Sequence, residues 1–137
     1  MILDLLEAVA PLPDDVLLLI VGEGHGRQRV ESRVAELELG KRVRVTGSVD
    51  DVRPFYAACD VFAYPYELDR PWMAVLEAQA YGRPVITMRT ESAEITVQDG
   101  RTGLLATDLN EFRDHLATLT SDRRRCESMG GARPATT

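Results

Sequence analysis

One segment, residues 60–86, constrains the fold of this chain more than any other part of the sequence. It begins as an apolar strand, passes through a proline-containing loop into an apolar helix, and ends in a second apolar strand after Gly82. A helix between two apolar strands predicts a crossover connection and therefore parallel strand pairing. Asp69 and Glu77 flank the point where the loop becomes the helix. Open α/β sheets bind ligands at such strand-to-helix junctions, so this segment also contains the first candidate site.

The same alternation of short apolar strands and helical periodicity runs through most of the chain. We expect strands at residues 16–21, 43–46, 62–64, 85–87 and 104–106. We expect helices at residues 2–10, 27–39, 50–58, 71–82 and 109–120. A continuous apolar run such as 16–21 is typical of a strand buried on both faces. The pattern predicts an α/β fold, a Rossmann-like parallel sheet flanked by helices over residues 1–121, with residues 122–137 as a frayed tail.

The length and the overall composition argue against several functional classes. A length of 137 residues is enough for one domain with a proper core. A net charge of −6 argues against a nucleic-acid partner, which would need a basic face. Cys59 and Cys126 follow no disulfide or metal-binding pattern, and no apolar run approaches the roughly 20 residues of a membrane span. We therefore expect a cytoplasmic protein with no membrane span, no metal and no cofactor.

Glu77 is the most informative acidic residue, because it lies on an otherwise apolar helix. At helical spacing it shares a face with Met73 and Ala80. A carboxylate in such surroundings must either reach water or accept hydrogen bonds from a specific partner. Two readings remain open from the residues alone, a solvent-exposed edge glutamate and a group that binds ligand hydroxyls, as acidic residues do with ribose in nucleotide folds.

The start of the same helix offers a second candidate group. Asp69 precedes this start, and its two possible roles are helix capping and a ligand contact. The backbone N–H groups of Trp72, Met73 and Ala74 are the unpaired donors of the helix and can cradle a diphosphate. Pro71 suits this position, because its missing N–H costs nothing in the first turn.

Two glycine turns follow the first two expected strands. Gly22 ends the first strand, and Gly47 follows Thr46 at the end of the second. We interpret both first as turn geometry and second as sites where a ligand can approach the backbone closely. Glu67 and Asp69 superficially resemble a metal clamp, but the surrounding prolines and the lack of further clustered carboxylates argue against one.

Taken together, these residues resemble the C-terminal, donor-binding half of retaining glycosyltransferases of the GT-B fold, particularly those of family 4, the glycosyl transferases of group 1. The matching motifs occur in the order of the family: Ile20-Val-Gly-Glu-Gly24, Val43-Arg-Val-Thr-Gly47, Tyr56-Ala-Ala-Cys-Asp-Val-Phe62, Pro65, Leu76-Glu-Ala78, Gly82-Arg-Pro-Val85, Glu94 and Asp99-Gly-Arg-Thr-Gly-Leu-Leu105. The resemblance covers about residues 2–120, and the ordered set is far more specific than any one motif.

The resemblance implies a nucleotide-diphosphate sugar donor, linked to UDP or GDP, and transfer of its hexose to an acceptor with retention of configuration. It places the base near the Gly47 loop, with Gly22 and Thr46 among the donor contacts. The diphosphate would lie on the start of helix 71–82, where Trp72, Met73 and Ala74 supply backbone N–H groups. Glu77 matches the glutamate that holds the ribose.

Asp69 falls where the family has the glutamate that contacts the donor sugar, which makes it the candidate catalytic residue. It is one methylene shorter than that glutamate. Tyr66 replaces the usual serine after the loop proline, and Pro71-Trp72 occupies the place of an expected glycine. These departures concern the contacts to the phosphates and to the sugar.

Compared with the family, we expect the chain to lack the first strand of this domain, the acceptor-binding domain and the returning C-terminal helix. It should then be inactive alone and need a separate acceptor domain, or form a homodimer through exposed strand edges. The alternative is a non-catalytic nucleotide-binding or interaction module, or a truncated remnant.

Overall fold

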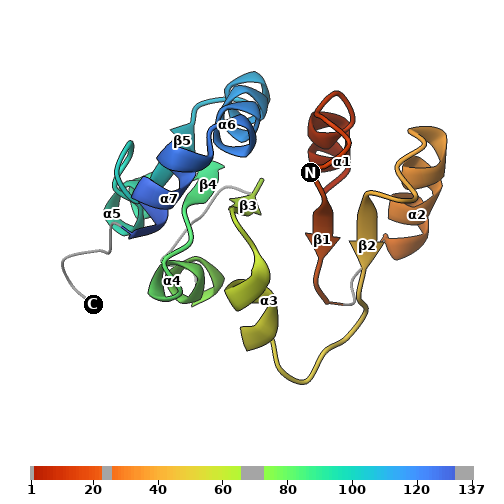
Figure 1. The fold of residues 1–137 in the computed structure, drawn as a ribbon, viewed down its shortest axis with the longest axis horizontal. Coiled ribbons are helices and arrows are strands. Elements are labelled where there is room, and N and C mark those ends of the chain that lie inside the picture. The colour runs from red at the N-terminus through yellow and green to blue at the C-terminus, as the bar shows by residue number, and fades with distance from the viewer. Residues whose placement is uncertain (1, 23–25, 66–72, 132–137) are drawn as a thin grey trace. The chain divides into compact units, whose positions relative to one another are not determined.

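The computed structural model describes residues 2–22, 26–65 and 73–131 of the chain. It separates into two compact units, Met1–Phe55 and Tyr56–Thr137, which we call the first and second unit. Each unit contains a parallel sheet with helices packed against it, as Figure 1 shows. Within the described residues, no helix is both long and apolar enough to cross a bilayer.

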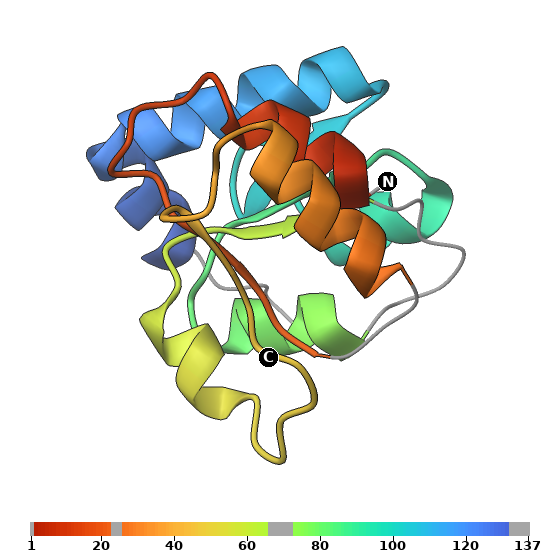
Figure 2. The same ribbon diagram turned by 90° about the vertical axis from the view of Figure 1, so that its right-hand side faces the viewer.

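The first unit is built on two parallel strands. Its elements are α1 (Ile2–Val9), β1 (Leu18–Ile20), α2 (Arg27–Glu36) and β2 (Val43–Val45). Strand β1 pairs with β2 in the register Leu18↔Val43 to Ile20↔Val45. Helices α1 and α2 pack against each other, as Figure 2 shows. The core of this unit gathers around Leu6, Val30 and Leu39.

Strand β1 differs from the expectation of burial on both faces. Leu18 and Ile20 pack into the core, whereas Leu17 is 71% exposed and Leu19 40% exposed. Successive side chains of a strand point to opposite faces, and the core cluster of this unit draws on one face only. The continuous apolar run therefore indicated a strand correctly without specifying how each face is covered.

Arg42 ties the end of α1 to the rest of the first unit. Its guanidinium donates to the carbonyl oxygens of Val9 (3.1 Å), Ala10 (3.4 Å), Pro13 (3.0 Å) and Val16 (3.3 Å). Helices end with carbonyls that lack intrahelical partners, and the side chain of Arg42, only 11% exposed, satisfies two of them here. This contact fixes the turn that leads from α1 into β1.

The second unit carries a three-stranded parallel sheet in the order β3-β4-β5. Helix α3 (Arg53–Ala58) leads into it across the boundary between the units. The further elements are β3 (Phe62–Tyr64), α4 (Met73–Ala80), β4 (Val85–Met88), α5 (Glu91–Thr96), β5 (Gly103–Ala106), α6 (Leu109–Ser121) and α7 (Arg123–Gly131). Every β4 residue is buried, as expected for the central strand.

Close backbone packing holds β5 against β4. A Cβ atom at Gly103 would collide with the carbonyl of Val85 on the neighbouring strand. The core behind them is apolar and consists of Val75, Ala78, Val85, Ala93, Val97 and Leu105. Strands and helices thus alternate as predicted, and the fold class is α/β and Rossmann-like.

The end of the chain differs from the frayed tail expected for residues 122–137. Residues Arg123–Gly131 form helix α7, and Cys126 and Met129 on it are buried. Gly130 lies so close to Gly82 that a Cβ atom on either would clash with the backbone of the other. The helix is held by small residues and by a few apolar contacts, too few to produce a visible periodicity in the sequence.

Candidate functional site

In the first unit, the structure brings together three residues that the sequence assigned to donor binding. Gly22 and Gly47 form an antiparallel bridge where β1 and β2 end. The Gly22 N–H donates to Thr46 Oγ1 at 3.1 Å, and the Thr46 hydroxyl donates to the Gly47 carbonyl at 2.9 Å. The hydroxyl of Thr46 therefore joins the two glycine turns and is engaged inside the protein. We call these three residues the glycine edge.

Backbone conformation explains why glycine occupies both turns. Gly22 has a φ of 111° and Gly47 a φ of 73°, values that side chains strain to adopt. Among the residues that the structure describes, none would come within 4 Å of a Cβ atom at Gly22. The glycine edge is thus a pair of backbone turns at the carboxyl ends of parallel strands.

In the second unit, Glu77 lies half-buried on α4. Burial, followed by the charge of Glu77 and hydrogen bonding to it, raises the pKa of Tyr56 to about 12. Tyr56 is therefore neutral at physiological pH. The two readings left open by the sequence, an edge glutamate and a group that binds ligand hydroxyls, both stay predictions.

The start of α4 is described from Met73 onward. The side chain of Met73 is 68% exposed, and Ala74 is half-buried. Asp69 and Trp72, the predicted catalytic residue and one of the predicted diphosphate contacts, lie outside the described residues. Their roles therefore stay predictions.

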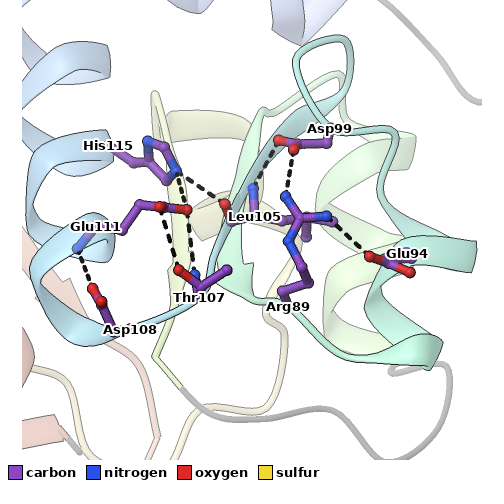
Figure 3. A network of polar contacts seen from close by, with 8 residues as sticks. All are labelled: Arg89, Glu94, Asp99, Leu105, Thr107, Asp108, Glu111 and His115. Carbon is purple, nitrogen blue, oxygen red and sulfur yellow. Dashed lines mark hydrogen bonds and ion pairs between the residues drawn. The ribbon is translucent and has the colours of Figure 1, made fainter.

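The carboxyl end of β4 carries a charged group that the sequence analysis did not single out. Arg89 pairs with Glu94 on α5 at 3.0 Å and with Asp99 at 2.7 Å, as Figure 3 shows. The same Asp99 carboxylate accepts a hydrogen bond from the Leu105 N–H at 3.1 Å. We call Arg89, Glu94 and Asp99 the charged edge. The sequence signal that could have identified this charged group is an arginine directly after the buried strand Val85–Met88.

Mutual pairing determines the ionisation of the charged edge. Hydrogen bonds to Glu94 and then to Asp99 raise the pKa of Arg89. Partial burial acts to raise the pKa of Asp99, but the bonds from the Leu105 N–H and from Arg89 outweigh it, and the pKa lies below its ordinary value. Arg89 and Asp99 are therefore charged at neutral pH, and Glu94, noted in the sequence as part of a matching motif, lies 3.0 Å from the guanidinium of Arg89.

The loop after β5 is fixed by a second set of contacts in the same network (Figure 3). Asp108 caps α6 by accepting from the Glu111 N–H at 2.8 Å. The Glu111 carboxylate accepts from the Thr107 N–H at 3.3 Å and lies 3.4 Å from His115 Nε2, which is 3.0 Å from the Leu105 carbonyl. These contacts hold the loop that leads from β5 into α6.

The arrangement offers hydrogen-bonding groups rather than metal ligands. In residues 2–22, 26–65 and 73–131, no group of three or more histidine, cysteine or acidic side chains could hold a metal ion. The backbone turns of the first unit and, separately, the Glu77 carboxylate of the second unit can each form hydrogen bonds with a polar ligand.

Comparison with known proteins agrees with this architecture. The family profile of the glycosyl transferases of group 1 matches residues 1–122. The lipopolysaccharide core biosynthesis glycosyltransferase LpsE of Rhizobium meliloti is 39% identical over 101 residues, which are 74% of this chain and 29% of that protein. A GDP-mannose-dependent phosphatidylinositol monomannoside mannosyltransferase of Mycolicibacterium smegmatis is 30% identical over 129 residues, 86% of this chain and 34% of that protein.

Solved structures show the same fold. Anabaena Alr3699/HepE, crystallised with UDP and glucose, superposes with a TM-score of 0.82 at 25% identity, covering 94% of this chain and 37% of that one. The chain spans about a third of the length of the curated relatives that it matches. The predicted fold and family resemblance are thus confirmed, and the chain belongs to the glycosyl transferases of group 1.

Proposed function

We propose that this chain binds the nucleotide-diphosphate sugar of a retaining glycosyltransferase that transfers a hexose to an acceptor. In that reaction, the bond between the sugar and the diphosphate breaks, and a bond to an acceptor hydroxyl forms with the same anomeric configuration. The observation that carries the proposal is the glycine edge, in which Thr46 joins the Gly22 and Gly47 turns where two parallel strands end. Crevices at such strand ends are the usual ligand sites of open α/β sheets.

Glu77 is proposed to accept hydrogen bonds from the ribose hydroxyls of the donor. A carboxylate has about four acceptor positions, which is enough for two hydroxyls. The start of α4, with Met73 and Ala74, is proposed to receive the diphosphate through backbone N–H groups and the positive end of the helix. Asp69 keeps its predicted role beside the transferred sugar.

The names of related proteins support a nucleotide-linked donor. Alr3699/HepE was crystallised with UDP and with UDP-glucose, and the mycobacterial relative is named as GDP-mannose-dependent. UDP and GDP donors therefore stand as alternatives for this chain. We further propose that turnover needs a separate acceptor-binding domain. A cytoplasmic location agrees with the free thiols of Cys59 and Cys126, which a reducing compartment maintains.

Calorimetric titration of the chain with UDP, GDP, UDP-glucose and GDP-mannose tests the proposal. We expect saturable binding of one base class, and a loss of about tenfold in affinity on Glu77→Gln, since a charged acceptor is replaced by an amide. Glu127→Gln on α7 is the matched control, because it removes an exposed carboxylate without touching the proposed site. The absence of heat and of chemical-shift change with every ligand at millimolar concentration would overturn the proposal.

A further inference from the structure

A cavity lies at the edge of the second unit's sheet where β3 and β4 begin. Asp60 comes just before β3, and residues 81–84 connect α4 to β4. Because the two strands are parallel, both connections lie at the amino edge of the sheet, opposite the charged edge. Residues of α7 complete the wall, and the cavity has a volume of about 410 Å³, in the range of small-molecule sites.

Contacts between segments that are distant in sequence hold the walls of this cavity. The Arg83 guanidinium donates to two carbonyl oxygens near the end of α3, at 3.0 and 2.7 Å. The Cys126 thiol donates to the Asp60 carbonyl at 3.3 Å. Gly82 and Gly130 approach each other so closely that a Cβ atom on either would clash with the backbone of the other. The cavity is therefore formed before a ligand arrives, which lowers the cost of binding.

Tyr81 contributes an aromatic ring to the wall. The ring is stacked on that of Tyr56, with centroids 5.7 Å apart and an interplanar angle of 19°, and 37% of Tyr81 remains exposed. Asp60 and Glu127 line the same cavity and are exposed. A carboxylate accepts hydrogen bonds at about four positions. The cavity thus combines a fixed aromatic ring with several hydrogen-bond acceptors.

These groups match the two kinds of surface that a sugar ring presents. Its C–H groups pack against an aromatic ring, and its neighbouring hydroxyls donate to carboxylates. A phosphate group would be repelled by the two carboxylates, so a nucleotide suits this cavity poorly. A cation is the competing ligand, because carboxylates and an aromatic ring attract it, but Arg83 in the same wall repels it. An uncharged ring rich in hydroxyls therefore suits the cavity best.

We propose that this cavity is a second binding site of the chain, which takes a neutral pyranose against the Tyr81 ring, with its hydroxyls donating to Asp60 and Glu127. The site goes beyond the proposed function and does not rest on it, because the donor is proposed to bind at the glycine edge and at Glu77. A sugar in this cavity is bound without being transferred, since the start of α4, the proposed diphosphate site, lies at the opposite edge of the sheet.

Assigned amide spectra of the unmodified chain, titrated with the methyl α-glycosides of glucose, mannose and galactose, test the proposal. We expect saturable shifts of Gly82, Arg83 and Gly130 with at least one of these sugars. Spermidine and arginine methyl ester are titrated in parallel as cationic ligands. Shifts of the cavity amides by a cation but by no sugar would overturn the proposal, and so would the absence of shifts with all three sugars at high millimolar concentrations.

Two substitutions of Tyr81 separate the ring from its hydroxyl. We expect Tyr81→Ala to weaken sugar binding by about tenfold, and Tyr81→Phe to change it by less than about twofold, because phenylalanine keeps the ring. Ile95→Ala is the matched control, since Ile95 is another exposed apolar residue of the second unit and does not line the cavity. Thermal melts verify folding. Unchanged affinity in Tyr81→Ala, or equal losses in Tyr81→Ala and Ile95→Ala, would contradict the role of the ring.

Glu127→Gln tests the hydrogen-bond acceptors without altering the packing of the ring. We expect sugar affinity to fall by about threefold, because an amide replaces a charged acceptor, while nucleotide affinity stays unchanged. Full sugar affinity in both Glu127→Gln and Asp60→Asn would overturn the assigned contacts. A chain that binds the sugars but no nucleotide overturns the proposed function alone, and a chain that binds a nucleotide but no sugar overturns this inference alone.

Discussion

The carboxyl ends of the strands are built differently in the two units. The glycine edge of the first unit is made of backbone, with one neutral hydroxyl joining two turns of positive φ. The charged edge of the second unit is made of ionised side chains that satisfy one another, with Arg89 between two carboxylates. We therefore propose the glycine edge as the ligand site, whereas the charged edge uses its polar groups to hold loops.

Glu77 is the exception within the second unit. It lies on a helix rather than at the charged edge, and its described partner is a neutral hydroxyl rather than a cation. Within residues 2–22, 26–65 and 73–131, no ion pair joins Glu77 to a cation in the way that Arg89 joins Asp99 and Glu94. We therefore expect Glu77, and not the charged edge, to be the donor-binding group of its unit.

The largest expected effect comes from placing a side chain in the glycine edge. Gly47→Val forces a β-branched residue to a φ of 73° at a buried position, and we expect nucleotide affinity to fall by about 100-fold. Gly100→Val in the second unit is the matched control, because it places the same side chain at a φ of 84°, and no described residue would lie within 4 Å of a Cβ atom there. Calorimetry should show normal affinity in the control; equal losses in both would remove the distinction between the edges.

The next effect concerns the anchoring arginines of the two units. Arg42→Met removes the hydrogen bonds to four carbonyl oxygens, two of which keep a backbone donor, and we expect the free energy of unfolding to fall by about 2–3 kcal/mol. Arg89→Met breaks ion pairs that face solvent, and its effect on denaturant midpoints should be smaller. A larger loss from Arg89→Met would show that the charged edge is the main structural anchor.

A smaller effect is expected from the hydroxyl that joins the glycine turns. Thr46→Val keeps the shape of the side chain and removes both hydrogen bonds, which should cost about 1 kcal/mol of stability. Because the two turns are then no longer joined by hydrogen bonds, nucleotide affinity should fall severalfold as well. Thr46→Ser restores the hydroxyl and should recover most of the affinity. A stable Thr46→Val variant with full affinity would contradict the role given to this contact.

The smallest effect is the acid dependence of the charged edge. The pKa of Asp99 is lowered in the folded state, so the unfolded chain binds protons first as the pH falls. Its stabilisation is thus present above the ordinary value of 3.8 and is lost as the pH falls through that value and below. Asp99→Asn should remove this acid-dependent part of the free energy of unfolding, which we expect to be less than about 1 kcal/mol. Chemical denaturation between pH 3 and pH 7 measures it, and an unchanged curve would show that Asp99 contributes nothing.

The sequence predicted the fold through its regular alternation of apolar strands and helices. Strand Val85–Met88 shows why this worked, since a buried central strand is a continuous apolar run. Helix α7 shows where it failed, because the contact between Gly82 and Gly130 depends on tertiary packing and leaves no periodic signal. Local pattern therefore reveals elements with large apolar faces and misses those held by close backbone approach.

The candidate site was predictable to a similar extent. Gly22 lies 24 residues from Thr46, yet the resemblance to a family placed Gly22, Thr46 and Gly47 among the donor contacts, and the structure brings these residues together. The pairing of Tyr56 with Glu77 was not predicted, because a tyrosine on one helix and a glutamate on another carry no shared sequence signal. Contacts between side chains of distant elements require the folded arrangement.

The central claim, the proposal that the chain binds a donor nucleotide, is tested most directly by assigned amide spectra of the chain titrated with UDP and with GDP. We expect one nucleotide to shift the resonances of Gly22, Gly47 and Glu77 in a saturable way. The amides of Gly82 and Gly130, which lie away from the carboxyl ends of the strands, should stay unchanged. Shifts confined to Gly82 and Gly130, or none at millimolar nucleotide, would contradict the account.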